Sequence, residues 1–292
     1  DLITEAINST RGRALESLVH LGFWIRRHIS DDPVPEVTEI LSNRIAEDAE
    51  FPLTRPEHAL LGMHFGNLCA LNREWAIDQR EILFPHANIP TWREAFSSYI
   101  RFNRPATEMF KILREDFLFA LDNLDLFTAA KDDDRQIIDR LGQHLFAYYM
   151  WQIYPLKADN SLLVRFYDKT TDDRQYWARL FDHVGRSLSN SGKHLNKELT
   201  DRAIAYFDWR FETAEPLELQ EFTFWLEAEC LDPEWRLRSY SRILDLGHGK
   251  NELLSLNFNT LNKLLPGHLP LVVECFAKIT DTLDQNTQMY IS

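Results

Sequence analysis

Apolar residues recur at helical spacing from one end of this chain to the other. This is the spacing i, i+3, i+4, i+7 that places side chains on a single face of an α-helix. The first such stripe is Leu15, Leu18, Val19 and Gly22, and further stripes lie within residues 110–124, 137–148, 177–188 and 203–211. A chain with this pattern throughout is expected to fold almost entirely into helices.

Composition supports the same fold class. The chain contains 41 Leu but only 7 Val, and 10 Gly among 292 residues. Leu loses little rotamer freedom in a helix, whereas Val is stiff at χ1. Two short runs, Leu162–Tyr167 and Leu271–Phe276, lack the alternation of a strand, so we predict that both are helical.

Capping signals mark where several helices begin. Thr54–Glu57 reads as a capping box that opens a helix through Leu71, and Thr91–Glu94 reads as a second box. Asp232 precedes Pro233, a typical cap followed by a proline at the first helical position. Pro266-Gly267 is expected to break the chain before a last helix from about Leu269 to Leu283.

These segments amount to roughly twelve to fourteen helices of about 10 to 20 residues. Pairs recur at intervals of roughly 40 residues, which is the size of HEAT-type units. We predict an irregular α-solenoid of stacked helix pairs, HEAT- or TPR-like, because no single pair can bury its apolar face alone. The turn Tyr154–Ser161 suggests an N-terminal half, 1–154, and a C-terminal half, 155–292, of one continuous helical array. The chain begins in mid-pattern at Asp1, so we interpret it as part of a longer protein.

The net charge indicates which classes of partner the chain can bind, and the cysteines indicate its redox compartment. The formal net charge is −13, which disfavours direct binding of nucleic acid. Cys69, Cys230 and Cys275 are isolated and odd in number, which favours buried thiols in a reducing cytoplasm over a disulfide framework. The apolar runs are shorter than the roughly 18 residues of a membrane helix, so no membrane association is expected.

Sequence motifs for common chemistries are missing. The chain has no GxxxxGK[ST], GxGxxG, HExxH, CxxC or GxSxG pattern. We therefore expect no catalytic residues, no bound cofactor and no metal site. His58 and His64 are predicted to be core or surface residues, not ligands, and His144 to be a hydrogen-bonded packing residue.

Six residues are candidates for contacts with a partner. Arg11 and Arg13 lie near a helix start, where they could bind an anion. The alternative reading of this stretch is a capped helix in which Gly12 allows a neighbour to pack closely. The pairs Trp209-Arg210 and Trp235-Arg236 combine residue types that are enriched at interface hot spots, although any single Trp can equally be a core residue.

One stretch also resembles a known family. Ala6–Glu16 (AINSTRGRALE) is similar to an INS-x-RG-x-A-x-E element in the C-terminal helical regions of large bacterial antiphage proteins. Those proteins join a sirtuin-like NAD-consuming domain or a STAND-type NTPase to a long helical sensor. Further stretches fit the same pattern and extend the resemblance to roughly two thirds of the chain: Val184–Leu188, Thr200–Arg202, Asp208–Arg210 and Phe224–Leu226.

The resemblance implies a non-catalytic module that senses a phage protein or restrains an effector domain. Any NADase or NTPase activity would then belong to other parts of a parent protein, which could also be an oligomer. Two alternatives stay open: a structural oligomerisation scaffold, and an enzyme with a metal or carboxylate site between helices.

Overall fold

A computed structural model describes residues 2–29, 34–46, 50–127, 132–156, 161–213, 215–248 and 254–289, with backbone alone for 132–135 and 281–289. Within these ranges the chain forms seventeen α-helices and one 3-10 helix, with no strand. The predicted all-α class is therefore confirmed. No helix in the described ranges is both long and apolar enough to cross a membrane.

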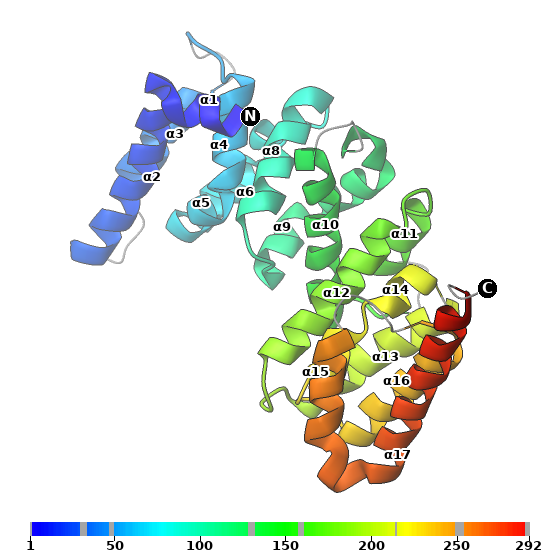
Figure 1. The fold of residues 1–292 in the computed structure, drawn as a ribbon. Coiled ribbons are helices and arrows are strands. Elements are labelled where there is room, and N and C mark those ends of the chain that lie inside the picture. The colour runs from blue at the N-terminus through cyan, green and yellow to red at the C-terminus, as the bar shows by residue number, and fades with distance from the viewer. Residues whose placement is uncertain are drawn as a thin grey trace. The chain divides into compact units, whose positions relative to one another are not determined.

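The chain divides into two compact units, Asp1–His144 and Leu145–Ser292. The predicted halves meet slightly later, at Tyr154, and residues 157–160 of the turn proposed there lie outside the described ranges. Helices of the first unit (Figure 1) are α1 (Leu2–Asn8), α2 (Thr10–His28), α3 (Pro35–Ile45), α4 (Arg55–Met63), α5 (Phe65–Leu71), α6 (Arg73–Asp78), α7 (Arg80–Leu83), α8 (Ile89–Phe102), α9 (Thr107–Asp122), the 3-10 helix η1 (Leu124–Phe127) and most of α10 (Asp132–Met150).

The second unit begins inside α10. It continues with α11 (Leu162–Lys169), α12 (Gln175–Asn190), α13 (Lys197–Thr213), α14 (Pro216–Gln220), α15 (Thr223–Glu227), α16 (Pro233–Asp245) and α17 (Leu254–Met289). Both runs that could be mistaken for strands are helical, in α11 and α17.

The first unit is built on a close approach between α4 and α8. A Cβ added at Gly62 on α4 would lie 2.2 Å from the carbonyl oxygen of Ala95 on α8, so only glycine fits there. Around this contact α8 buries a row of aromatic rings, with Trp92 stacked on Phe96 at 5.1 Å between centroids. The backbone contact and the rings together fix the position of α8.

Aromatic stacking also organises the second unit. Trp225 on α15 stacks on Phe181 of α12 at 5.1 Å and donates from Nε1 to the carbonyl oxygen of Phe181 at 3.0 Å. Gly185 lies under the same ring, where a Cβ would be 2.7 Å from Trp225 Cδ1. Trp225 has no exposed surface, which identifies α12 and α15 as the centre of this core.

Two of the three predicted helix starts are correct. The box at Thr54 forms as expected, and the Asp232 side chain caps α16 by accepting from the backbone N–H of Trp235 at 2.9 Å. The box at Thr91 was wrong because α8 begins earlier: Asn88 accepts from the Thr91 N–H and Pro90 occupies the first turn.

Helix lengths differ more from the prediction. The segment expected to run to Leu71 is divided at His64, whose φ and ψ of −89° and 3° end α4 before α5 begins. The expected break after Pro266-Gly267 is confirmed, because non-helical angles at His268 (φ −138°, ψ 39°) divide α17 just before Leu269. Short helices such as α7, with four residues, arise from such interruptions.

Candidate functional site

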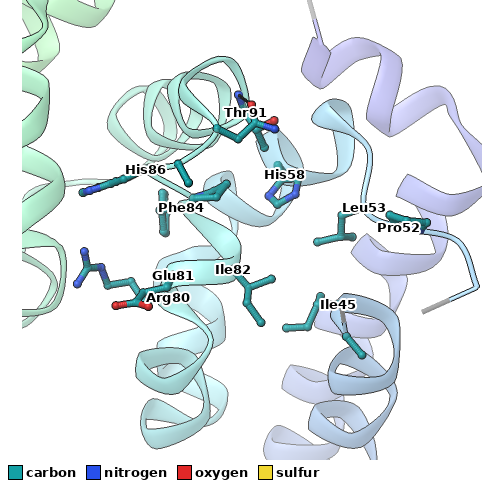
Figure 2. Close-up of a pocket in the computed structure, with 14 residues that line it drawn as sticks. Ile45, Pro52, Leu53, His58, Arg80, Glu81, Ile82, Phe84, His86 and Thr91 are labelled. Atoms are coloured by element: carbon teal, nitrogen blue, oxygen red, sulfur yellow. Dashed lines mark hydrogen bonds between the residues drawn. The ribbon is translucent and has the colours of Figure 1, made fainter. Parts of the chain in front are cut away.

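A pocket of about 630 Å³ opens in the first unit, among α3, α4, α7 and the segment that joins α7 to α8 (Figure 2). Much of its wall is apolar, and its polar groups come mainly from α4, α7 and the start of α8. The lining residues are Ile45, Ala46, Pro52, Leu53, His58, Arg80, Glu81, Ile82, Phe84, Pro85, His86, Ala87, Asn88 and Thr91. The volume lies within the range of ordinary ligand pockets.

One side of the pocket is fixed by the start of α4. Glu57 accepts from the backbone and the hydroxyl of Thr54, both at 2.8 Å, and it also pairs with Arg44 of α3. Burial alone would raise the pKa of Glu57, but these hydrogen bonds and the guanidinium outweigh it and lower the pKa. The charged carboxylate thereby joins α3 to α4 beside Leu53.

His58 contributes a polar group to the wall between these helices. Its Nδ1 lies 3.3 Å from the carbonyl oxygen of Leu83, to which Nδ1–H donates, and 8% of the residue is exposed. Burial lowers the pKa of His58. The pocket therefore contains a neutral imidazole at pH 7, held by one hydrogen bond.

The other side is organised by Asp116 of α9, which is completely buried. Its carboxylate accepts from Arg80 Nε at 3.1 Å, from His86 Nε2 at 2.8 Å and from Trp92 Nε1 at 2.9 Å. His86 also stacks on Phe119 at 4.5 Å. In Figure 2, Arg80 and His86 extend to the same side of the pocket, opposite Ile45 and Leu53.

Asp116 therefore positions groups of the pocket wall without lining the pocket itself. Three donors occupy a carboxylate that has no contact with solvent, so it is a poor candidate for a general base. Arg80 and His86 keep 21% and 33% of their side chains exposed. In the described ranges no group of three or more His, Cys, Asp or Glu has the geometry to hold a metal ion.

A smaller pocket of about 360 Å³ shares Arg80 and Glu81 with the first. Its two other cations, Arg73 and Lys111, both bind Glu108, at 2.7 and 2.6 Å. Arg80 thus lies between the two pockets, and its guanidinium is held by a buried partner. The combined surface suits an apolar side chain of a ligand together with neighbouring polar groups.

The predicted candidates of the first segment lie outside both pockets. Ser9 caps α2 by accepting from the N–H of Gly12, and a Cβ at Gly12 would lie 1.9 Å from the carbonyl oxygen of Ala6. The reading as a capped helix with close packing at Gly12 is confirmed. Arg11 lies over the Phe51 ring at 4.9 Å, and Arg13 donates to the carbonyl oxygen of Ile7 at 3.1 Å; both are exposed.

Arg210 is buried in the second unit, not displayed on its surface. It binds both carboxylate oxygens of Glu218 through Nε, at 2.9 and 3.2 Å, and lies over the Tyr167 ring at 3.8 Å. Trp209 is half-buried and contacts the same tyrosine edge to face, at 5.0 Å. This pair stabilises the core and is not exposed to a docking protein.

The Trp235-Arg236 pair on α16 also lies largely inside the second unit. Arg236 is 5% exposed and donates to the carbonyl oxygen of Leu226 at 2.8 Å. Trp235 is half-buried against Phe207, with 5.0 Å between centroids. The structure therefore does not bring the six predicted candidates together into one site.

Asp116 and its partners were missed by the sequence reasoning. The available signal was an acidic residue at a buried position of the α9 stripe, between Leu113 and Ala120. Charged side chains are almost never fully buried unless they are paired. An Asp at that position therefore indicates a partner, although the sequence does not show which one.

Histidines and cysteines have mainly packing roles. His144 donates from Nε2 to the carbonyl oxygen of Asn103 at 3.1 Å, and burial lowers its pKa to about 4, as expected of a packing residue. Burial likewise raises the pKa of Cys69 and of Cys275 to about 12, which makes both thiols unreactive. Cys230 is only half-buried, and all three are unpaired.

Comparisons with protein family models, curated proteins and solved structures find no match to this chain.

Proposed function

We propose that this chain is a protein-recognition module without catalytic activity of its own, and that it acts in bacterial antiviral defence. Its partner would be a phage protein or an effector domain that it restrains. The observation that carries the proposal is the pocket of the first unit, whose apolar wall and positioned Arg80 suit an inserted side chain of another protein.

The resemblance of Ala6–Glu16 supports the antiviral setting. In that stretch Ser9 caps a helix and Gly12 lets α2 contact Ala6. These are structural roles, as expected of an element that positions helices in a sensor. We further propose that the helix pairs stack in a HEAT-like array, because pairs that recur at intervals of roughly 40 residues cannot each bury an apolar face alone.

A binding assay with defined candidates tests this function. The purified chain would be titrated with purified phage structural proteins and with sirtuin-like and STAND-type effector domains. Micromolar or tighter binding to one of them is expected. Leu53→Glu, which places a charge in the pocket wall, should weaken that binding by about tenfold or more. Leu246→Glu is the matched control, because Leu246 is 45% exposed in the second unit.

A turnover assay tests the proposal that the chain has no catalytic activity of its own. The same preparation would be incubated with NAD and with ATP, and the products measured by chromatography. Release of nicotinamide or phosphate that scales with the amount of chain would contradict the proposal.

The oligomerisation scaffold is a second candidate, favoured by α17. Leu269 and Val273 lie one turn apart on the part of this helix that follows the kink at His268, and they are 54% and 52% exposed. Such a stripe resembles one side of a helix–helix contact. Light scattering over a concentration series decides: a monomer at all concentrations removes this candidate.

A further inference from the structure

The outward face of α2 differs from the remaining surface of the first unit. We name as the α2 outer face the six exposed residues Arg13, His20, Leu21, Trp24, Arg27 and His28. At 3.6 residues per turn these positions fall on one side of the helix, opposite the buried Leu15, Val19 and Gly22. The face therefore runs along nearly the whole helix.

Apolar exposure on this face is large. Leu21 is 47% exposed and Trp24 is 54% exposed. Tryptophan and arginine are the residue types most enriched at the energetic centres of protein interfaces. Trp24 with Arg27 one turn away on a surface helix thus has the composition of a docking face.

Charge on the α2 outer face is positive and not neutralised. Arg13 and Arg27 form no ion pair within the part of the chain that the structure describes, whereas Arg44, Arg55 and Arg73 on following helices all do. The face has no carboxylate, although the chain as a whole has a net charge of −13. This local reversal of sign requires an acidic partner to be complemented.

The carboxylate of α2 does not cancel this charge. Glu16 is half-buried at the margin of the face. Burial lowers the pKa of His64, and the nearby Glu16 partly opposes that lowering. Glu16 is thus close enough to His64 to act on its pKa, and the described residues show no ion pair from Glu16 to Arg13 or Arg27.

Contacts behind the face hold it in place. Arg26 donates to the carbonyl oxygen of Ala70, and Gly22 packs against Leu71, to which an added Cβ would be 3.0 Å. On the face itself Trp24 and His28 are ring neighbours at 5.4 Å. A helix fixed on its inner side has little backbone entropy left to lose when a partner binds its outer side.

We propose that the α2 outer face binds an acidic amphipathic helix of a partner protein. An apolar stripe on that helix would cover Leu21 and Trp24, and its flanking Glu or Asp side chains would pair with Arg13 and Arg27. A single-stranded nucleic acid would also supply negative charge and could stack on Trp24. Such a strand has no aliphatic stripe, however, and would leave Leu21 uncovered. This inference rests on the proposed recognition function and adds the chemistry of the partner.

The test uses the full chain and a labelled peptide of about 18 residues, a helix with a Leu stripe flanked by Glu. Fluorescence anisotropy should show saturable binding that weakens with salt. Trp24→Ala and Arg27→Glu should each weaken it by about tenfold or more. Both residues are exposed, so the fold should survive, which far-UV circular dichroism checks.

Matched variants distinguish binding at the α2 outer face from nonspecific binding elsewhere on the chain. Trp151→Ala removes a tryptophan that is 45% exposed in the second unit, and Arg104→Glu makes the same charge change at an exposed position outside α2. Both should bind the peptide within about twofold of the unaltered chain. Equal losses in Trp151→Ala and Trp24→Ala would overturn the proposal.

Two further ligands test whether a basic helix or a nucleic acid binds this face instead. A peptide with Lys in place of Glu should bind at least about tenfold more weakly, and an oligothymidylate should show no Trp24-dependent binding. Absence of acidic-peptide binding, or nucleic-acid binding lost in Trp24→Ala, would overturn the inference. If a phage protein or an effector binds and Trp24→Ala does not weaken it, the inference fails while the proposed function stands.

Discussion

Each unit buries a carboxylate, and the two are used in opposite ways. In the first unit Asp116 accepts from Arg80, His86 and Trp92, and two of these donors remain partly exposed beside a pocket. In the second unit Glu218 pairs with Arg210, of which only 3% is exposed, under a cover of aromatic rings. Equally buried carboxylates can thus organise a surface or complete a core, depending on whether their partners reach solvent.

Breaking the core pair should have the largest effect. Arg210→Met leaves the Glu218 carboxylate buried without its partner, which is expected to cost about 3–5 kcal/mol of stability. Urea denaturation followed by tryptophan fluorescence measures the loss. The double variant Arg210→Met/Glu218→Gln should recover much of it, and a double variant no more stable than the single one would contradict this account.

Acid should weaken the first unit through His144. Its folded pKa of about 4 lies below the ordinary value of 6.5. The unfolded chain therefore binds more protons between these values, and stability is fully present above pH 6.5 and is lost as the pH falls toward 4. The loss approaches about 3 kcal/mol. Denaturation at a series of pH values checks the slope, which should be shallower in His144→Gln.

Close packing around glycine gives a matched pair of tests. In Gly62→Ala the new methyl group meets the immobile backbone of Ala95, whereas in Gly185→Ala it meets the Trp225 side chain. We expect a loss of about 2–3 kcal/mol for the first and about 1 kcal/mol for the second, because a ring can shift. The reverse order in thermal melts would show that Trp225 is held more rigidly than α8.

The effect of a change at the pocket is expected to be smaller than that of breaking the core pair. Asp116→Asn keeps an acceptor for Trp92 but removes the charge that holds Arg80 and His86. We therefore expect the free energy of unfolding to fall by about 2 kcal/mol. Histidine NMR signals should show His86 released from its position. If the His86 signal is unchanged, Asp116 does not position the pocket.

Local sequence signals predicted most of the fold. Thr54 and Asp232 mark real helix starts because each cap needs only a short stretch of chain. Thr91 misled the prediction because Asn88 and Pro90 offered an earlier start, and two adequate caps compete within one turn. The break at His64 has no comparable marker, since neither Gly nor Pro occupies it.

The candidate site was largely beyond local reasoning. Arg80, His86 and Trp92 reach Asp116 across separations of 24 to 36 residues, so no spacing rule connects them. Arg210 and Arg236 were expected at the surface because arginine is mostly exposed. Glu218 and the Leu226 carbonyl, which make their burial tolerable, lie eight and ten residues away on other elements.

The border between the units falls inside α10, and this limits how the chain could have been inherited. Before the border, His144 bonds to Asn103 of the first unit; after it, the Tyr149 hydroxyl donates to the carbonyl oxygen of Arg202 in the second, at 2.8 Å. A crossover at the border would sever a helix, and one after Met150 would deprive the second unit of Tyr149. Each cut is therefore expected to destabilise the unit that loses part of α10.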